Sequence, residues 1–145
     1  MVEDKPKCTI NSKEYLDNDQ IKVVKDALLF ESIRFQTAVT IIIDSGRRRE
    51  EVLALRYCDI NILSGLVTVE NAFVKSKLTY NHIIKKVKTK ASERRFYITN
   101  HALELVKNLR TFKESCGIVV HDDDYIFTAW DSNDLIAPEI TSKEW

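Results

Sequence analysis

The stretch from Asp44 to Leu55, which reads DSGRRREEVLAL, decides how this chain folds. An apolar helical run ends just before it, in three consecutive isoleucines. Gly46 then breaks the run, because glycine adopts a positive φ without the steric cost that a Cβ brings. Beyond the break, the spacing of Val52 and Leu55 begins a second helical pattern. The sequence therefore predicts a helix–turn–helix corner, with Arg47–Arg49 on or just before the N-terminus of the second helix. We call residues 46–49 the arginine corner.

The three arginines of this corner are placed where a phosphate binds well. Free backbone N–H groups and the positive end of the helix dipole favour an anion at a helix N-terminus. A guanidinium adds a planar fork that holds two phosphate oxygens at once. For Arg47 and Arg49, a purely solvated position stays open beside contact with backbone phosphate. We therefore expect an anion contact at the corner.

The composition is that of one soluble globular domain. Of its 145 residues, 44% are hydrophobic and 30% are charged, which is typical of a chain that buries its own core. No apolar run approaches the roughly 20 residues that span a bilayer, and no signal-peptide pattern opens the chain. Cys8, Cys58 and Cys116 are widely spaced, which indicates reduced thiols and not a disulfide framework or a zinc site. These features favour a cytoplasmic protein without a membrane segment.

The charge of the chain is balanced in total but not in its distribution. The net charge is zero, with 22 basic and 22 acidic residues. Residues 75–95 carry eight lysines and arginines against one glutamate, a net charge of +7, whereas residues 114–145 carry a net charge of −7. Such polarity steers a polyanion onto one face of a protein even when the total charge cancels.

Helical patterns alternate with polar breaks over much of the chain. Residues 1–13 are polar and suit a linker or disordered arm, after which Asp17 is placed to cap a helix. A second helix is expected from about Ser32 to Asp44, and the helix after the arginine corner is expected to end near Tyr57. Asn100 is expected to cap a further helix, whose apolar stripe comprises Ala102, Leu105, Val106, Leu109 and Phe112.

Between these helices the period changes to that of strands. Leu66–Val69 alternates like a strand, a segment with Ile83 and Ile84 follows, and Arg95–Ile98 is the third. The link from Lys88 to Arg94 is short and polar, so the last two strands are expected to form a hairpin. The predicted fold class is α+β, mostly helical, with a small three-stranded antiparallel sheet.

The three histidines are interpreted as surface residues. His121 precedes Asp122–Asp124, a composition that also suits a metal ion. Four adjacent residues in a loop more often form a solvated acidic turn, and we expect no metal site here.

Two motifs together resemble the catalytic domain of tyrosine recombinases, the phage integrase family. That family carries Thr-Gly-x-Arg-x-x-Glu-Leu followed by Leu-x-Trp-x-Asp-Ile, and this chain matches it at Gly46, Arg48, Glu51, Leu55, Asp59 and Ile60. The run VKTKASER at 87–94 is similar to the family's Lys-Thr-Lys-x-Ser-x-Arg hairpin. The chain departs from the pattern at Arg47, Glu50 and Tyr57, where an apolar residue, a small residue and tryptophan are usual.

The resemblance covers residues 14–145 and implies the N-terminal portion of an integrase-type catalytic domain. The family's His-x-x-Arg box and its nucleophilic tyrosine are not among these residues, so the chain is expected to be cut from a longer enzyme and to be inactive alone. In full-length form such an enzyme breaks and rejoins DNA strands through a 3′-phosphotyrosine intermediate. It needs no metal or small-molecule cofactor, since the covalent link keeps the phosphodiester energy.

The resemblance also implies roles for individual residues. Arg48 is similar to the first of two arginines that stabilise the transition state, and Lys88 to the hairpin lysine that protonates the leaving 5′-oxygen. Lys90 takes that role if the hairpin register shifts by two residues. Glu51 is similar to the acidic residue that supports the active-site arginine and histidine, and a simple ion pair with an arginine is the alternative. The residues expected to contact DNA are Arg47, Arg49, Lys85, Lys86, Lys90 and Arg94.

The implied partners are double-stranded DNA and, in a synaptic complex of full-length enzyme, other recombinase protomers from a phage or mobile element. A non-catalytic DNA-binding module with the same basic hairpin and arginine corner is the alternative. A third interpretation is an α+β interaction domain whose basic and acidic faces bind protein. Steep salt dependence of DNA binding separates the first two from the third.

Overall fold

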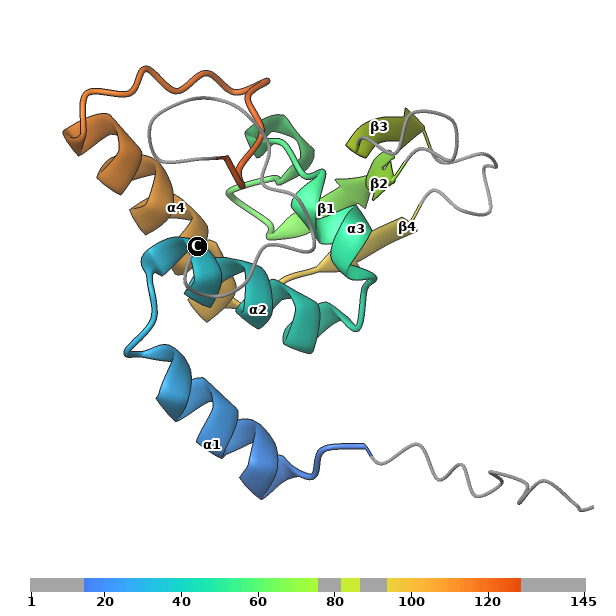
Figure 1. The fold of residues 1–145 in the computed structure, drawn as a ribbon, viewed down its shortest axis with the longest axis vertical. Helices are drawn as coiled ribbons and strands as arrows, with labels where there is room; N and C mark the ends of the chain where they lie inside the picture. Colours follow the sequence, from blue (N-terminus) through green and yellow to red (C-terminus); the bar gives the residue numbers. More distant parts are fainter. Residues whose placement is uncertain (1–14, 76–81, 87–93, 129–145) are drawn as a thin grey trace, which may run out of the picture. The chain divides into compact units, whose positions relative to one another are not determined.

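The computed structural model describes residues 15–75, 82–86 and 94–128, and the chain divides into two units, residues 1–30 and 31–145. The described part of the first unit holds α1 (Asn18–Leu28) (Figure 1). A reciprocal pair of hydrogen bonds fixes its start, because the Asp17 carboxylate accepts the Gln20 N–H at 2.8 Å and the Gln20 side chain accepts the Asp17 N–H at 2.9 Å. The predicted cap at Asp17 is confirmed, and the predicted arm at 1–13 lies outside the described residues.

The described part of the second unit contains three α-helices, α2 (Ile33–Ser45), α3 (Arg49–Leu53) and α4 (Asn100–Ser115). The Ser32 hydroxyl begins α2 by accepting the Phe35 N–H, and the Thr99 hydroxyl begins α4 by accepting the Ala102 N–H at 3.2 Å. The prediction that Asn100 is the cap of α4 is therefore wrong by one position. No described helix is long and apolar enough to cross a membrane.

The helix after the arginine corner is a single short turn, and the prediction that it runs to Tyr57 is wrong. Ala54 leaves helical geometry at φ −93° and ψ 7°. Downstream of it, backbone groups bond to a distant segment: the Leu55 carbonyl accepts the Ile126 N–H at 2.9 Å, and the Tyr57 N–H donates to the Asp124 carbonyl at 3.1 Å. These tertiary bonds end α3 and lead into a 3₁₀ turn, η2 (Tyr57–Asp59).

The strands within the described ranges form two antiparallel pairs and not the expected single three-stranded sheet. β1 (Leu66–Val69) pairs with β4 (Arg94–Tyr97), and β2 (Asn71–Lys75) pairs with β3 (His82–Lys86). The last two strands therefore do not pair with each other, and the predicted β3–β4 hairpin is wrong. Only Glu70 separates β1 from β2, so one extended stretch offers its first half to β4 and its second half to β3.

The inward face of both pairs is set by strand alternation. Val67 lies opposite Phe96, and Phe73 lies opposite Ile84. Thr68 lies opposite the exposed Arg95 on the other face. Each pair thus has an apolar side that faces the core.

The core of the second unit lies where α2, α3 and α4 meet the strands. α2 packs against α4 and α3, and α3 packs against β2 (Figure 1). Ile41, Leu109 and Val67 have no exposed surface, and Phe127 and Ile126 from the loop after α4 are equally enclosed. The core therefore joins residues from 38 to 127, well beyond the corner itself.

The apolar stripe of α4 holds at four of its five predicted positions. Ala102, Leu105, Val106 and Leu109 are buried, but Phe112 is 46% exposed. Lys113 lies four residues after Leu109 and is only 2% exposed. The helix thus continues its buried face with a lysine, because the 3.6-residue period favours that position.

Two glycines with positive φ should respond differently to a methyl group. Gly46 ends α2 at φ 64° with open space around its Cβ position, whereas a Cβ on Gly65 (φ 75°) meets the Ile98 carbonyl oxygen at 3.1 Å. Gly46→Ala should lower the free energy of unfolding by about 1–2 kcal/mol, the cost of a left-handed non-glycine residue. Gly65→Ala should lower it further. Urea unfolding followed by circular dichroism measures both, and a smaller loss for Gly65→Ala contradicts this account.

Candidate nucleic-acid interface

The arginine corner is built by a glycine break between two helices, as the sequence predicts. Gly46 is left-handed and its N–H donates to the Ile42 carbonyl at 2.9 Å, which closes α2. The Arg47 N–H donates to the Ser45 hydroxyl at 3.3 Å. Arg48 is extended at φ −69° and ψ 141°, and α3 begins at Arg49. Because α3 has only five residues, its dipole adds little, and anion binding here depends on the side chains.

Arg48 has the environment expected of an anion contact. Its side chain is exposed. Within the described residues it makes no hydrogen bond or ion pair, whereas its backbone carbonyl accepts the Glu51 and Val52 N–H groups at 3.0 and 3.1 Å. The backbone of Arg48 is thus held while its guanidinium fork is available to a phosphate.

The neighbouring arginines differ from Arg48 and from each other. Arg49 is exposed and lies 3.5 Å from the Glu50 carboxylate, a surface pair of the kind worth only ~0–1 kcal/mol. Arg47 is half-buried, with its guanidinium carbon 5.1 Å from the centre of the Phe96 ring. Its Nε is buried and has no hydrogen-bond partner among the described residues. Three consecutive arginines therefore occupy three different environments, which the sequence does not reveal.

Glu51 is buried one helical turn after Arg48. It is 8% exposed, and its Oε2 has no hydrogen-bond partner in the described parts of the chain. No ion pair joins it to Arg48 among those residues. A buried carboxylate oxygen without a donor is costly and calls for an explanation. Its support of an active-site group remains a prediction.

The basic residues of the strands are only partly within the described ranges. Lys85 and Lys86 of β3 are exposed, and strand alternation directs them to opposite faces. Arg94 begins β4, opposite Val69. The predicted general acid Lys88 and its alternative Lys90 lie outside the described residues, so the structure does not choose between them.

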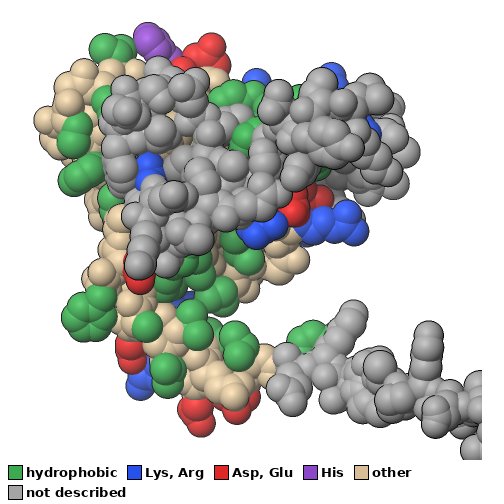
Figure 2. All heavy atoms as spheres, in the orientation of Figure 1, with side chains coloured by type: hydrophobic (Ala, Val, Ile, Leu, Met, Phe, Trp, Pro, Cys, Tyr) green, Lys and Arg blue, Asp and Glu red, His purple; other side chains and the backbone are tan. Residues whose placement is uncertain are grey.

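Charge on the visible face of the second unit is mixed. Figure 2 shows basic and acidic side chains next to each other beside the part that is not described. Arg56 contributes to this mixing, because it contacts the Asp59 carboxylate at 3.1 Å and the Glu70 carboxylate at 3.3 Å. The hydrogen bond to Asp59 raises the pKa of Arg56. Arg56 is therefore occupied by its own carboxylates, unlike Arg48.

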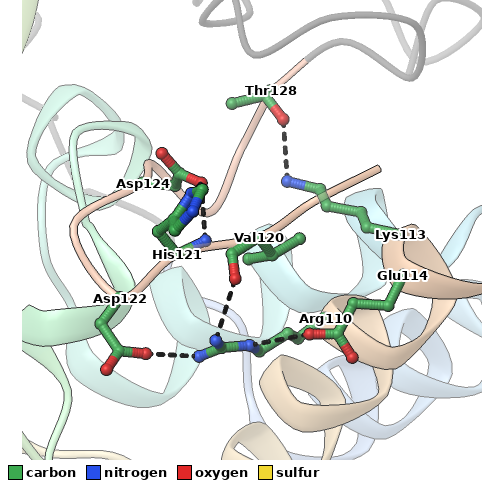
Figure 3. A network of polar contacts seen from close by, with 8 residues as sticks. All are labelled: Arg110, Lys113, Glu114, Val120, His121, Asp122, Asp124 and Thr128. Carbon is green, nitrogen blue, oxygen red and sulfur yellow. Dashed lines mark hydrogen bonds and ion pairs between the residues drawn. The ribbon is translucent and has the colours of Figure 1, made fainter. Parts of the chain in front are cut away.

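The acidic loop after α4 is tied down by its own hydrogen bonds (Figure 3). The Arg110 guanidinium contacts the carboxylates of Asp122 at 2.8 Å and Glu114 at 3.3 Å. The His121 N–H donates to the Asp124 carboxylate at 2.7 Å. Two of the three aspartates thus have partners in the protein, and no cluster of three metal-ligating residues occurs in the described ranges. This loop holds the segment that carries Ile126 and Phe127 into the core.

Two buried cations that the sequence did not predict anchor the end of this segment. The Lys113 ammonium donates to the Ile126 carbonyl at 2.6 Å and the Thr128 hydroxyl at 2.8 Å, the second of which is drawn in Figure 3. The Arg34 guanidinium donates to the Thr128 carbonyl at 2.8 Å. Burial lowers the pKa of Lys113 to about 8, and the nearby Arg34 charge adds to this effect. Burial also lowers the pKa of Arg34 to about 10.

Tyr57, the first described tyrosine that follows the arginine corner in the sequence, has a buried phenol. Tyr57 is 6% exposed, its hydroxyl is buried without a hydrogen-bond partner in the described ranges, and burial raises its pKa. Arg110 lies 5.3 Å from the centre of its ring. Tyr97 is 69% exposed. Burial and the raised pKa both argue against Tyr57 as a nucleophile.

Comparison with solved structures identifies the fold. The transposon Tn1549 integrase in complex with a circular intermediate DNA superposes with a TM-score of 0.63 at 13% identity, over 81% of this chain and 39% of that one. The same integrase in complex with transposon right end DNA gives a TM-score of 0.62 at 13% identity, over 86% of this chain and 42% of that one. XerA recombinase gives 0.60 at 18% identity, over 86% of this chain and 38% of that one.

The fold is similar to that of tyrosine recombinases. The chain spans about two-fifths of the length of these solved structures. No family model matches the sequence, and no curated protein matches it. The likeness therefore establishes the fold, which agrees with the resemblance of the two sequence motifs.

The buried Lys113 predicts an unusual pH dependence of stability. Its pKa is about 8 in the folded chain and near 10.5 in the unfolded chain, so between these values the unfolded state binds more protons. The free energy of unfolding should therefore rise with pH from about 8 to 10.5, by at most a few kcal/mol at about 1.4 kcal/mol per pKa unit. Below pH 8 both states are protonated, and the burial penalty is present in full.

Chemical unfolding at a series of pH values measures this rise. Lys113→Met should abolish it, while Lys107→Met on the exposed face of α4 serves as the control and should retain it. Arg34, with a pKa of about 10, adds a further rise near the upper end in both variants. An identical pH profile for Lys113→Met and the unmodified chain contradicts the assignment.

Proposed function

We propose that this chain is the N-terminal portion of a tyrosine recombinase catalytic domain, which acts on double-stranded DNA. The observation that carries the proposal is Arg48: an exposed guanidinium without a partner among the described residues, on a backbone held at a left-handed helix break. This position matches the first arginine of the family motif. The fold similarity to an integrase solved with DNA supports the same proposal.

In the proposed reaction of the full-length enzyme, a tyrosine attacks a DNA phosphate and displaces the 5′-oxygen. Negative charge grows on the equatorial phosphate oxygens as the bond to the tyrosine forms. A fixed guanidinium in front of those oxygens lowers the barrier, because its donors are already oriented. Arg48 supplies such a group, and Lys88 is proposed to donate the proton that the leaving 5′-oxygen takes up.

Glu51 is proposed to hold active-site groups in position through its buried carboxylate. Its buried oxygen without a donor in the described ranges suits an acceptor that becomes paired when the site is complete. A donor from the rest of the full-length domain would remove the desolvation penalty of this oxygen. We propose that the chain alone forms no covalent adduct with DNA, since the motif's nucleophile is not among its tyrosines.

The first test is DNA binding by the chain itself. We expect weak, non-specific binding to a duplex, with a dissociation constant of roughly 10⁻⁴–10⁻⁶ M at physiological salt. The logarithm of the affinity should fall linearly with the logarithm of the salt concentration, since each phosphate contact releases counterions. Fluorescence anisotropy with a labelled duplex measures this dependence.

Substitutions separate the basic elements from the rest of the surface. Replacing Lys85, Lys86, Lys88 and Lys90 together by glutamine should weaken binding and flatten its salt dependence. Lys107→Gln, an exposed lysine on α4, is the control and should leave both unchanged. Binding that ignores salt, or that survives the fourfold substitution, points instead to the interaction-domain interpretation.

The second test is Arg48→Lys in the full-length recombinase. Lysine keeps the charge but loses the planar fork, so it cannot hold two phosphate oxygens in a fixed geometry. Loss of one preorganised donor costs on the order of 10²–10³ in rate. Single-turnover cleavage with saturating enzyme measures the chemical step without a contribution from binding.

Arg49→Lys is the matched comparison for this experiment. Arg49 is exposed and paired with Glu50, and such a contact is worth ~0–1 kcal/mol, or at most about fivefold. If the cleavage rate is unchanged in Arg48→Lys but strongly reduced in Arg49→Lys, the catalytic role belongs to Arg49 and the assignment to Arg48 is wrong.

A further inference from the structure

Arg47 is the arginine of the corner that the motif does not explain, because the family carries an apolar residue at this position. Its side chain is half-buried and is not paired with a carboxylate among the described residues. Its guanidinium carbon lies 5.1 Å from the centre of the Phe96 ring, and its Nε is buried without a hydrogen-bond partner there. The contact with Phe96 is thus the interaction that offsets its desolvation.

The partner ring belongs to a rigid part of the fold. Phe96 is 9% exposed and forms part of the core. It lies on β4 opposite Val67, which has no exposed surface. The ring is therefore fixed, whereas Arg47 sits in the turn between α2 and α3, where neither helix constrains it.

The contact between Arg47 and Phe96 joins the turn between α2 and α3 to β4. Arg47 is the residue directly before Arg48. The hydrogen bonds of this turn are local: the Gly46 N–H donates to the Ile42 carbonyl and the Arg47 N–H to the Ser45 hydroxyl, and the Arg48 carbonyl accepts from Glu51 and Val52. A side-chain contact that crosses from residue 47 to residue 96 adds the long-range restraint that these local bonds do not supply.

We infer that Arg47 is a positioning residue, which stacks on Phe96 and thereby fixes the direction in which Arg48 presents its guanidinium to DNA. This inference rests on the proposed function for its DNA part. It assigns to Arg47 a role other than direct contact with a phosphate. Stacking uses the face of the guanidinium and suits a flat cation over an aromatic ring.

The two roles predict different coupling between Arg47 and Arg48. If Arg47 acts through Arg48, Arg47→Ala weakens duplex binding in the unmodified chain by about two- to fivefold, as expected for loss of an exposed cation–π contact. The same substitution then has no further effect in the Arg48→Ala background, because residues that act as one unit are not additive. Phe96→Leu, which keeps an apolar side chain, should behave like Arg47→Ala.

If Arg47 instead contacts a phosphate directly, its loss weakens binding equally in both backgrounds. The salt slope then falls by about 0.9 in each. That result overturns the inference, and so does Arg47→Ala binding with unchanged affinity. The probe is a labelled duplex of mixed sequence, titrated by anisotropy at several salt concentrations, and Lys107→Ala is the control for loss of a distant surface cation.

Amide hydrogen exchange tests the restraint without DNA. The Glu51 and Val52 amides donate to the Arg48 carbonyl, so they report how firmly the corner is held. Arg47→Ala and Phe96→Leu should both speed their exchange by about two- to fivefold, while Arg49→Ala, whose side chain pairs with Glu50 at the surface, should not. The amides of α4 verify that each variant is folded.

The two measurements separate the inference from the proposed function. If the unmodified chain binds no duplex, the proposed function fails, and exchange alone decides whether Arg47 restrains the corner. Unchanged exchange at Glu51 and Val52 in Arg47→Ala overturns the inference whatever the DNA result. Faster exchange of the Glu51 and Val52 amides in Arg47→Ala, together with non-additive effects of Arg47→Ala and Arg48→Ala on duplex binding, supports both the inference and the proposed function.

Discussion

The left-handed conformation of Gly46 is the constraint on which the arginine corner depends. It stops α2 with one backbone hydrogen bond to Ile42 and turns the chain within two residues into α3. A residue with a Cβ is sterically strained at positive φ, so this turn suits glycine. Because the turn is tight, Arg47, Arg48 and Arg49 emerge on successive backbone positions with different directions, and each meets a different part of the protein.

The surroundings of these arginines, more than their shared charge, distinguish their roles. Arg49 lies beside the Glu50 carboxylate in solvent, where such a pair is weak. Arg47 lies over Phe96. Arg48 alone of the three is exposed and has no side-chain hydrogen bond, ion pair or ring contact among the described residues, while its carbonyl is held by α3. A phosphate contact needs this combination of a fixed backbone and an available fork. Arg56 differs in this respect, because its guanidinium is occupied by the carboxylates of Asp59 and Glu70.

The spacing of apolar residues and the glycine break at Gly46 are enough to predict the α+β class, the arginine corner and most of the buried face of α4. The sequence does not reveal β2 (Asn71–Lys75), because its apolar residues Ala72, Phe73 and Val74 are consecutive and do not alternate with polar ones as in a half-buried strand. The sequence does not distinguish Asn100 from Thr99 as the cap of α4, because both side chains carry a suitable oxygen. Lys113 was missed because a lysine at a core position is uncommon, although its spacing from Leu109 marks it. The stacking of Arg47 on Phe96 depends on tertiary structure and has no local signal.

The central claim is that DNA meets this protein at the arginine corner. A titration of the isotopically labelled chain with a short duplex, followed by amide chemical shifts at low and moderate salt, tests it most directly. We expect the largest shifts at Gly46–Glu50 and at the exposed Lys85 and Lys86 of β3, and we expect salt to reverse them. Shifts confined to α1 or to the acidic loop at 121–124, with the corner unchanged, would contradict it.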